Sequence, residues 1–372
     1  MRDFRGPSGP ETSRDPGSNP GRGTSPNRYE FINDNGDAPL DRSAAVRTLI
    51  GAGIGALALY LTLTHLTDVH RVLRTLLTAN PRWMAAAGLC EALWFLACVN
   101  GWRTTFSPLG ERPPRRWLFT LYTVKLMVNN LLSAGRVLGD AARIYYAARL
   151  GWPLRTIVPT VLADLILGNL GYLLVVLAAT GLALSSARVP TALAAVNAAG
   201  LIAGVGLWSL MRSERACREV YGSVHEAAES LLRRLGHPVG DANAFAESTV
   251  LVFRSRGSWV ALTHYTAGWA ARVLRLCCVT WAVWPAAPAL VPVIMSIAVR
   301  GSAVLSVSPA GLGIIEGVTA GALAMLGIDP SRVIAALLLD RVYATLLPVA
   351  LGAVGIVLLE RRAGVSDRGR VR

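Results

Sequence analysis

The sequence predicts an all-α polytopic membrane protein, and three observations favour this fold class. Hydrophobic residues make up 53% of the 372 residues, whereas charged residues make up only 16%. Mean hydropathy over the chain is +0.44. Several apolar stretches reach the roughly 20 residues that an α-helix needs to cross the hydrocarbon core of a bilayer. We expect about six full spans plus two re-entrant hairpins, or about eight segments, in an inverted internal repeat.

The chain is expected to divide into three parts. Residues 1–46 are rich in Gly, Pro, Ser, Asp and Arg and lack apolar periodicity, so they are predicted to be a disordered tail. Residues 47–362 are predicted to form the transmembrane domain, and residues 363–372 a basic C-terminal tail. Within the domain, residues 212–256 form the only sizeable polar segment. Its apolar residues recur at helical spacing, which indicates a helical connector at the membrane surface.

The predicted membrane segments differ in how they end. Those long enough to be complete spans are 49–66, 83–99, 157–180, 190–211, 259–284 and 333–359. Two other apolar stretches, 117–132 and 290–304, run into polar, Gly-containing motifs instead of ending in a loop. Short apolar limbs, 144–150 and 318–326, leave these motifs. Each motif is therefore predicted to be the tip of a hairpin that returns to the side from which it entered.

The two hairpins can be superimposed by one constant displacement along the chain, without a gap. This displacement places Asp140 on Glu316 and Asp164 on Asp340. It also places two short motifs, Ala134-Gly135 and Leu150-Gly151, on Ala310-Gly311 and Leu326-Gly327. Apolar segments interrupted by Gly or Pro at corresponding positions of two halves are typical of transporter-like cores.

The distribution of positive charge favours the model with hairpins. The chain has 37 Lys and Arg against 23 Asp and Glu, and such an excess lies mostly on the cytoplasmic side of membrane proteins. Six spans with two hairpins place both termini and the connector 212–256, with its seven Arg, in the cytoplasm. Eight full spans would place that connector outside. Arg71, Arg74 and Arg82 are exceptions to the rule in the favoured model.

Charged residues within the apolar segments and hairpins form the candidate site. A charge at the helix centre costs about 2.5–3.5 kcal/mol on insertion scales, so most of these residues should face one another or water. They are Glu91, Lys125, Arg136, Asp140, Arg143, Asp164, Arg272, Arg275, Arg300, Glu316, Asp340 and Arg341. Structural ion pairs, such as Asp140 with Arg143, are one explanation. Ser, Asn and Gly at the hairpin tips favour the other, a ligand site.

Phosphate on a lipid headgroup is the ligand that this chemistry suits. Arginine offers a bidentate fork to phosphate, and helix N-termini beside Gly-rich turns offer free N–H groups. We predict that Arg136, Arg143, Arg300 and Arg341 bind the phosphate, and that the four acids of the hairpins and following spans hold these arginines. The complete predicted site is Asn129, Asn130, Ser133, Gly135, Arg136, Gly139, Asp140, Arg143, Asp164, Arg300, Ser306, Ser308, Pro309, Gly311, Gly313, Glu316, Asp340 and Arg341.

Other site chemistries lack support in the sequence. The five cysteines form no CxxC motif, and His and Cys show no metal-ligand spacing. We therefore expect no disulfide, metal or cofactor, and no catalytic residue. The basic excess fits a membrane surface, so nucleic acid is not an expected partner.

The hairpin motifs resemble a known family. Residues 130–143 read NLLSAGRVLGDAAR, and residues 306–316 read SVSPAGLGIIE. With Arg341 as the closing arginine, they are similar to the transmembrane region of lysylphosphatidylglycerol synthases, a flippase-like family of prokaryotic membrane proteins, over about residues 49–359. Ser133, Asp140 and Leu165 stand where that family usually has Pro, Glu and Arg.

The resemblance implies a cell-membrane protein that handles or translocates anionic phospholipid or polyprenyl-phosphate-linked lipid. Two alternatives remain open: a non-catalytic partner of a glycosyltransferase or lipid-synthesis complex, and an intramembrane enzyme acting on lipid-linked phosphate. A homodimer is another possible assembly. Full-length synthases also carry a cytosolic aminoacyl-transferase domain. The chain ends soon after its last predicted span, so that activity is not expected of it.

Overall fold

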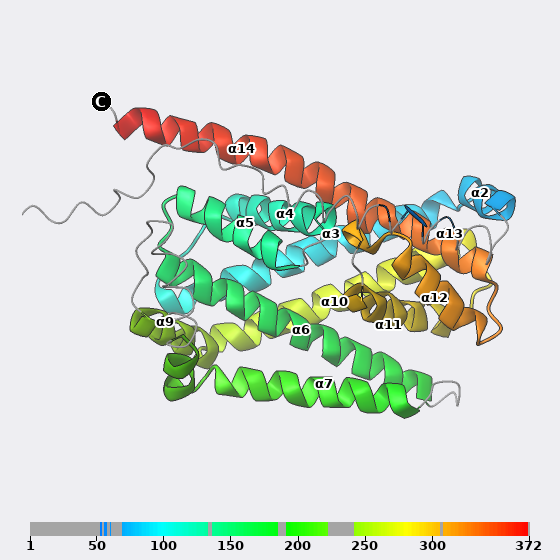
Figure 1. Cartoon of the computed structure of the whole chain (residues 1–372), viewed down its shortest axis with the longest axis horizontal. Helices are drawn as coiled ribbons and strands as arrows, with labels where there is room; N and C mark the ends of the chain where they lie inside the picture. The colour runs from blue at the N-terminus through cyan, green and yellow to red at the C-terminus, as the bar shows by residue number, and fades with distance from the viewer. Residues whose placement is uncertain are drawn as a thin grey trace, which may run out of the picture. The chain divides into compact units, whose positions relative to one another are not determined.

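The computed structural model describes residues 53, 56–57, 60, 69–132, 136–184, 191–221, 242–305 and 308–370. These residues lie in one compact unit, Leu40–Arg372, and every regular element in them is helical. Figure 1 shows their arrangement. The predicted tail 1–46 and most of the first predicted span, 49–66, lie outside the described residues.

The first half begins with a short helix and continues with four longer ones. They are α2 (Val69–Leu77), α3 (Pro81–Thr104), α4 (Arg115–Leu131), α5 (Arg136–Arg149) and α6 (Leu154–Leu184). Asn80 caps α3 by accepting a hydrogen bond from the backbone N–H of Arg82, and Pro81 occupies the first helical position. α4 begins directly after Pro114, whose extended backbone starts the helix.

A long helix, α7 (Thr191–Leu210), connects the halves. The second half consists of α9 (Ala242–Arg254), α10 (Arg256–Val283), α11 (Leu290–Leu305), α12 (Ile314–Ala324), α13 (Pro330–Arg341) and α14 (Leu347–Arg370). Asp329 caps α13 by accepting from the N–H of Ser331. A π-helical segment, Val342–Leu346, joins α13 to α14.

Three helical stretches in the described residues are long and apolar enough to cross a membrane: Pro81–Leu109, Leu154–Gly181 and Pro330–Arg362. They coincide with the predicted spans 83–99, 157–180 and 333–359. α10 has 28 residues, but its arginines lower its hydropathy. The apolar stretch within α7, Ala198–Leu210, is short. The helical membrane class is thus confirmed, while the number of spans stays a prediction.

The helices recur along the chain with the spacing found in the sequence. Under the displacement that places Asp140 on Glu316, the starts of α3, α4 and α6 fall within one residue of the starts of α10, α11 and α13. The starts of α2 and α5 fall within three residues of those of α9 and α12. An internal repeat would produce this correspondence.

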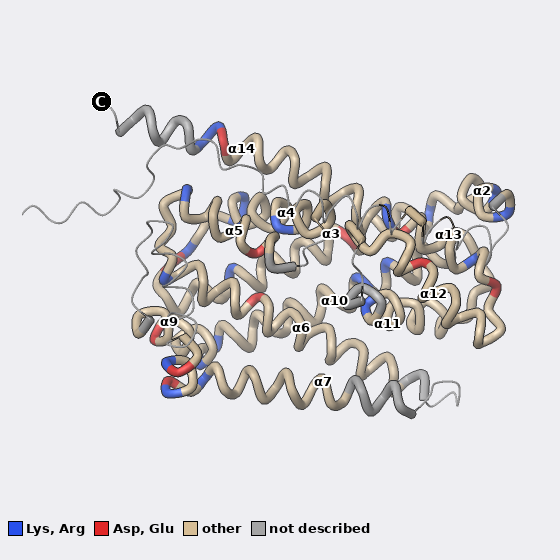
Figure 2. Tube along the Cα trace, viewed as in Figure 1, with Lys and Arg blue, Asp and Glu red and all other residues tan. Residues whose placement is uncertain are grey.

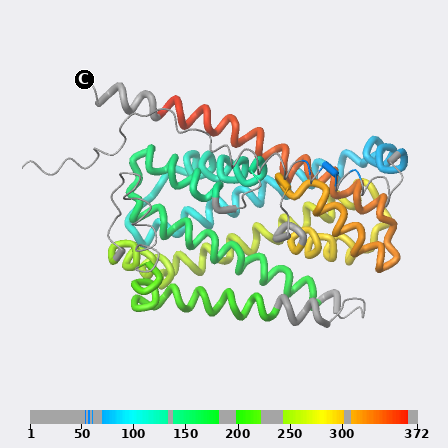
Figure 3. Tube along the Cα trace, viewed as in Figure 1, coloured from blue at the N-terminus to red at the C-terminus, as the bar shows by residue number. Residues whose placement is uncertain are grey.

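The central contact of the bundle is between α3 and α10, which run in opposite directions through its middle (Figure 1). Glycine allows their close approach, because a Cβ on Gly268 would lie 3.2 Å from the Cβ of Ala97. α2 packs against α13, and α9 packs against α6. The chain trace in Figure 3 shows α4 and α5 towards the end of the bundle that holds α9, and α11 and α12 towards the end that holds α2.

Candidate functional site

A cavity of about 350 Å³ lies in the middle of the bundle, where Figure 2 shows acidic and basic positions along the helices. Its wall combines residues of both halves and both hairpins. The charged residues in this wall are Lys125, Asp140, Asp164, Arg272, Arg275, Arg300, Glu316, Asp340 and Arg341. The cavity therefore brings together side chains from distant parts of the sequence.

The charges of the first half pair with one another. Asp164 accepts hydrogen bonds from Lys125 Nζ at 2.9 Å and from an Nη of Arg143 at 2.6 Å. Asp140 lies 3.1 Å from Lys125 and 2.8 Å from Arg143. The Arg143 guanidinium is fully buried and lies 4.6 Å from the centre of the Trp102 ring. Two cations and two acids balance one another, so this network resembles a structural brace more than a ligand site.

A second network joins α3, α10 and α13. Arg275 of α10 donates two parallel hydrogen bonds to Asp340, at 2.9 and 2.8 Å, and pairs closely with the fully buried Glu91. Asp164 and Asp340, which correspond under the same displacement along the chain, thus each accept from a buried arginine. The arginines come from different elements, α5 in one half and α10 in the other.

The tip of the second hairpin is tied to α13. Glu316 accepts hydrogen bonds from the backbone N–H of Gly313 at 2.8 Å and from Arg341 Nε at 2.7 Å. Arg341 also donates to the carbonyl of Ala310. Ala310 and Gly311 both have positive φ, 51° and 71°. For a residue with a Cβ this conformation carries strain, which the surrounding contacts must offset.

The first hairpin is closed by an asparagine and a glycine. Asn129 Oδ1 accepts a hydrogen bond from the Gly139 N–H at 3.1 Å. A Cβ on Gly139 would lie only 2.1 Å from that oxygen and 2.4 Å from the Lys125 carbonyl oxygen, so α4 and α5 can approach this closely only at glycine. Ser133 and Gly135 lie outside the described residues, as does Ser306 in the second hairpin.

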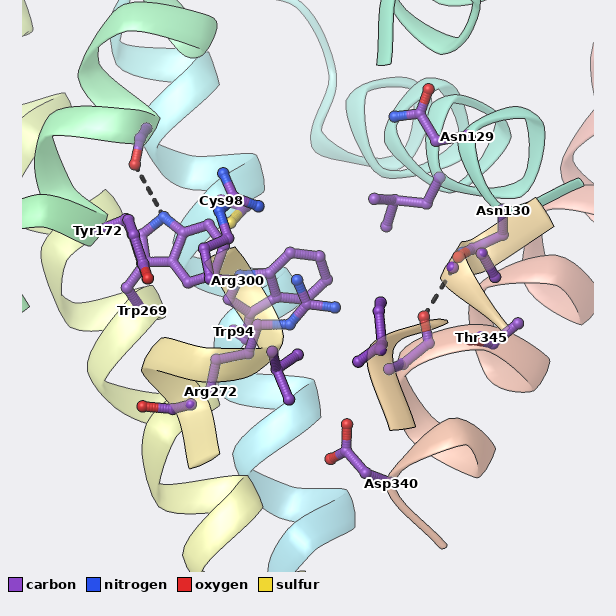
Figure 4. A pocket seen from close by; sticks show the side chains of 18 of the residues that line it. Trp94, Cys98, Asn129, Asn130, Tyr172, Trp269, Arg272, Arg300, Asp340 and Thr345 are labelled. Carbon is purple, nitrogen blue, oxygen red and sulfur yellow. Dashed lines mark hydrogen bonds between the residues drawn. The ribbon is translucent and has the colours of Figure 1, made fainter. Parts of the chain in front are cut away.

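Arginine and aromatic rings form one side of the cavity (Figure 4). The Arg272 guanidinium lies 4.1 Å from the Trp94 ring centre and 5.6 Å from that of Trp269. Arg300 lies 4.8 Å from Trp269 and 5.0 Å from Tyr172, and it donates to the Asn169 side chain at 3.0 Å. Trp269 is itself fixed by donating its Nε1–H to the Gly168 carbonyl at 2.8 Å.

Arg272 differs from Lys125, Arg275 and Arg341, which each pair with a carboxylate. Within the described part of the chain it forms no ion pair with a carboxylate, and its Nε is buried without a hydrogen-bond partner. Figure 4 shows it beside Arg300 and Trp94, on the side of the pocket opposite Asn129, Asn130 and Thr345. A half-buried guanidinium in this situation is suited to an anionic group that enters the cavity.

The predicted site residues separate into those that line the cavity and those that do not. The lining ones are Asn129, Asn130, Asp140, Asp164, Arg300, Ser308, Gly311, Glu316, Asp340 and Arg341. The described ones that do not line it are Gly139, Arg143, Pro309 and Gly313. Arg136 begins α5, and its side chain is not among those described.

Three charged residues of the cavity wall are absent from the predicted site, although their charge is evident in the sequence: Lys125, Arg272 and Arg275. A sequence pattern could have indicated Arg272 and Arg275. Trp269, Arg272 and Arg275 follow one another at intervals of three residues, which places them on one face of a helix.

Comparison with known proteins agrees with this architecture. A family model described as the lysylphosphatidylglycerol synthase TM region matches residues 48–352, a range that contains both hairpins and the whole cavity wall. No curated protein gives a significant match to the chain. Because the matched range covers well over half of the sequence, the chain belongs to the family of the lysylphosphatidylglycerol synthase TM region.

Proposed function

We propose that this protein binds the phosphate-bearing headgroup of an anionic lipid in the central cavity and carries it across the membrane as a flippase. The observation that carries this proposal is Arg272, a half-buried cation in the cavity wall without a carboxylate partner among the described residues. Removing a charge even partly from water without pairing it is unfavourable. A phosphate bound at the guanidinium would offset that cost.

The surroundings of Arg272 support a phosphate headgroup. Arginine presents two parallel N–H donors, which match two phosphate oxygens. Arg300, from α11, lies 4.8 Å from the Trp269 ring centre and Arg272 lies 5.6 Å from it, so two arginines approach the same part of the cavity. A volume of about 350 Å³ lies near the lower limit of ordinary ligand sites. That size suits a headgroup whose acyl chains stay in the bilayer.

The hairpins support translocation across the bilayer. α4, α5, α11 and α12 have 17, 14, 16 and 11 residues. At 1.5 Å per residue even α4 rises only about 26 Å, less than the ~30 Å hydrocarbon core. We infer that each pair enters the membrane partway, from opposite sides, as an inverted repeat. Such repeats let one half move against the other around a site at the midplane.

A transport assay with purified protein tests the proposal. Proteoliposomes would contain fluorescent phosphatidylglycerol, and an impermeant reagent would quench only the outer leaflet. The wild-type protein should move probe between leaflets faster than protein-free vesicles, and Arg272→Gln should lose most of this activity. Arg332→Gln is the matched control, because Arg332 also lies on a tryptophan ring but is half-exposed outside the cavity.

The outcomes separate the proposal from its alternatives. Equal transport by Arg272→Gln and Arg332→Gln would remove Arg272 from the site. Lipid binding that depends on Arg272 without any movement of probe would favour the role of a non-catalytic membrane partner over that of a flippase.

A further inference from the structure

A second recess lies outside the central cavity, where α3 ends and the chain turns into α4. Its volume is about 480 Å³. Arg103, Arg112 and Arg115 line it, together with Glu111 and His264, and none of these residues lines the central cavity. We propose that this α3–α4 recess binds the phosphate of an anionic lipid at the membrane surface. The proposal stands whether or not the protein translocates lipid.

The arginines of the recess lack ionic partners among the described residues. Within the described residues, none of the three guanidinium groups forms an ion pair or a side-chain hydrogen bond, and the Nε of Arg103 is buried without a hydrogen-bond partner. Glu111 is the one acid in the wall and does not pair with them. His264 uses Nδ1–H to donate to the Val260 carbonyl at 2.7 Å. Three arginines are thus available to one anion.

The turn that carries these arginines is held rigidly. Phe106 is buried, and its ring centre lies 5.5 Å from that of Trp102 and 5.8 Å from that of Trp152. Gly110 adopts φ 74°, which reverses the chain, and Pro114 then starts α4. A frame fixed before the ligand arrives lowers the entropy cost of binding.

Tryptophans indicate the depth of the recess in the membrane. Trp259, at the start of α10, is 52% exposed and lies 4.3 Å from Trp208. At the other end of α10, Trp281 lies 5.2 Å from Trp83. Tryptophan gathers at the level of the lipid headgroups. The 24 residues of α3 span about 36 Å, slightly more than the hydrocarbon core, so the recess lies where lipid phosphates lie.

Photo-crosslinking tests this site in the full-length chain. The protein would be placed in phosphatidylcholine nanodiscs containing phosphatidylglycerol with a photoreactive headgroup, and crosslinked peptides would be mapped. We expect crosslinks in residues 100–115. Arg112→Gln with Arg115→Gln should weaken them roughly ten-fold or more, because charge-assisted hydrogen bonds are lost. Both residues are exposed, so folding should survive. Arg215→Gln with Arg218→Gln is the control of equal charge.

Competition identifies the ligand. Excess phosphatidylglycerol should abolish the crosslinks, whereas added phosphatidylcholine or inorganic phosphate should not. Equal crosslinking in the Arg112/Arg115 variant and its control would overturn the site. Competition by inorganic phosphate as strong as that by phosphatidylglycerol would overturn the lipid assignment and leave free phosphate as the ligand. Arg272→Gln should leave these crosslinks intact, so failure of the central site would be recognised separately.

Discussion

Arg143 and Arg272 both lie on a tryptophan ring, but Arg143 is fully buried and Arg272 is half-buried, and their surroundings differ. Asp140 and Asp164 both lie within hydrogen-bond distance of Arg143, at 2.8 and 2.6 Å. Arg272 has no carboxylate partner among the described residues. Breaking a buried ion pair costs about 3–5 kcal/mol, because it leaves an uncompensated charge. We therefore expect the first arginine to contribute mainly to stability, and we propose that the second binds a ligand.

Asp164 should be the most sensitive acid of the first-half network. Asp164→Asn would leave Lys125 and Arg143 with one carboxylate between them, so we expect a loss of about 3–5 kcal/mol in stability. Thermal unfolding of the purified chain in detergent, followed by tryptophan fluorescence, measures this. Glu219→Gln is the control, since Glu219 is 67% exposed and forms a surface pair with Arg215, worth about 0.3–0.5 kcal/mol. Equal melting temperatures would show that the network is not a brace.

The sequence predicted which residues carry charge in the membrane but not how they pair. Its motifs identified Asp140, Asp164, Glu316 and Asp340, because these acids interrupt apolar runs at matched spacing. The partner of Asp340 could not be found in this way, because Arg275 lies 65 residues away and has no counterpart in the first half. Long-range packing, not local pattern, decides which arginines are neutralised.

At the scale of the helices, glycine sets how closely elements approach. The sequence predicted both hairpins, because polar, Gly-containing motifs interrupt apolar runs there. It did not predict that α14 packs along α4. That contact depends on Gly352, where a Cβ would lie 2.4 Å from the Met127 Cβ. The sequence around a glycine in an apolar helix does not indicate which helix packs against it. Such a contact with the other half of the chain can therefore be recognised only in the folded structure.

Gly139 provides the test of the first hairpin. Gly139→Ala should push α5 away from Asn129 and destabilise the fold by about 1–3 kcal/mol, as overpacking usually does. Gly206→Ala is the matched control, because a Cβ there meets nothing within 4 Å. It should be neutral or stabilising by up to about 1 kcal/mol. The melting temperatures of both variants measure these effects. A Gly139→Ala protein as stable as Gly206→Ala would mean that α4 and α5 do not pack tightly against each other.

At the scale of the whole molecule, the orientation of the bundle in the membrane can be tested at its two ends. Figure 1 places the end of α3, the starts of α4 and α6 and helix α9 at one end, and α2 with the turns after α10 and α12 at the other. The charge pattern of the sequence predicts that the first end faces the cytoplasm. Cys217 of the connector is buried, and burial raises the pKa of its thiol, so it should react slowly. Cysteines introduced at exposed positions are therefore needed to determine the membrane topology.

Single cysteines in a cysteine-free chain test this arrangement. In intact cells, an impermeant maleimide should label Ala286→Cys and Met325→Cys. It should label Glu111→Cys, Arg155→Cys and Arg361→Cys only after the membrane is permeabilised. All five positions are exposed. Glu111 and Arg155 flank the α4–α5 hairpin, so the two must share a side if the hairpin returns to where it entered. If α4 and α5 together made one crossing, as in the eight-span alternative, these two cysteines would be labelled from opposite sides, and the inverted repeat that the transport proposal requires would be excluded.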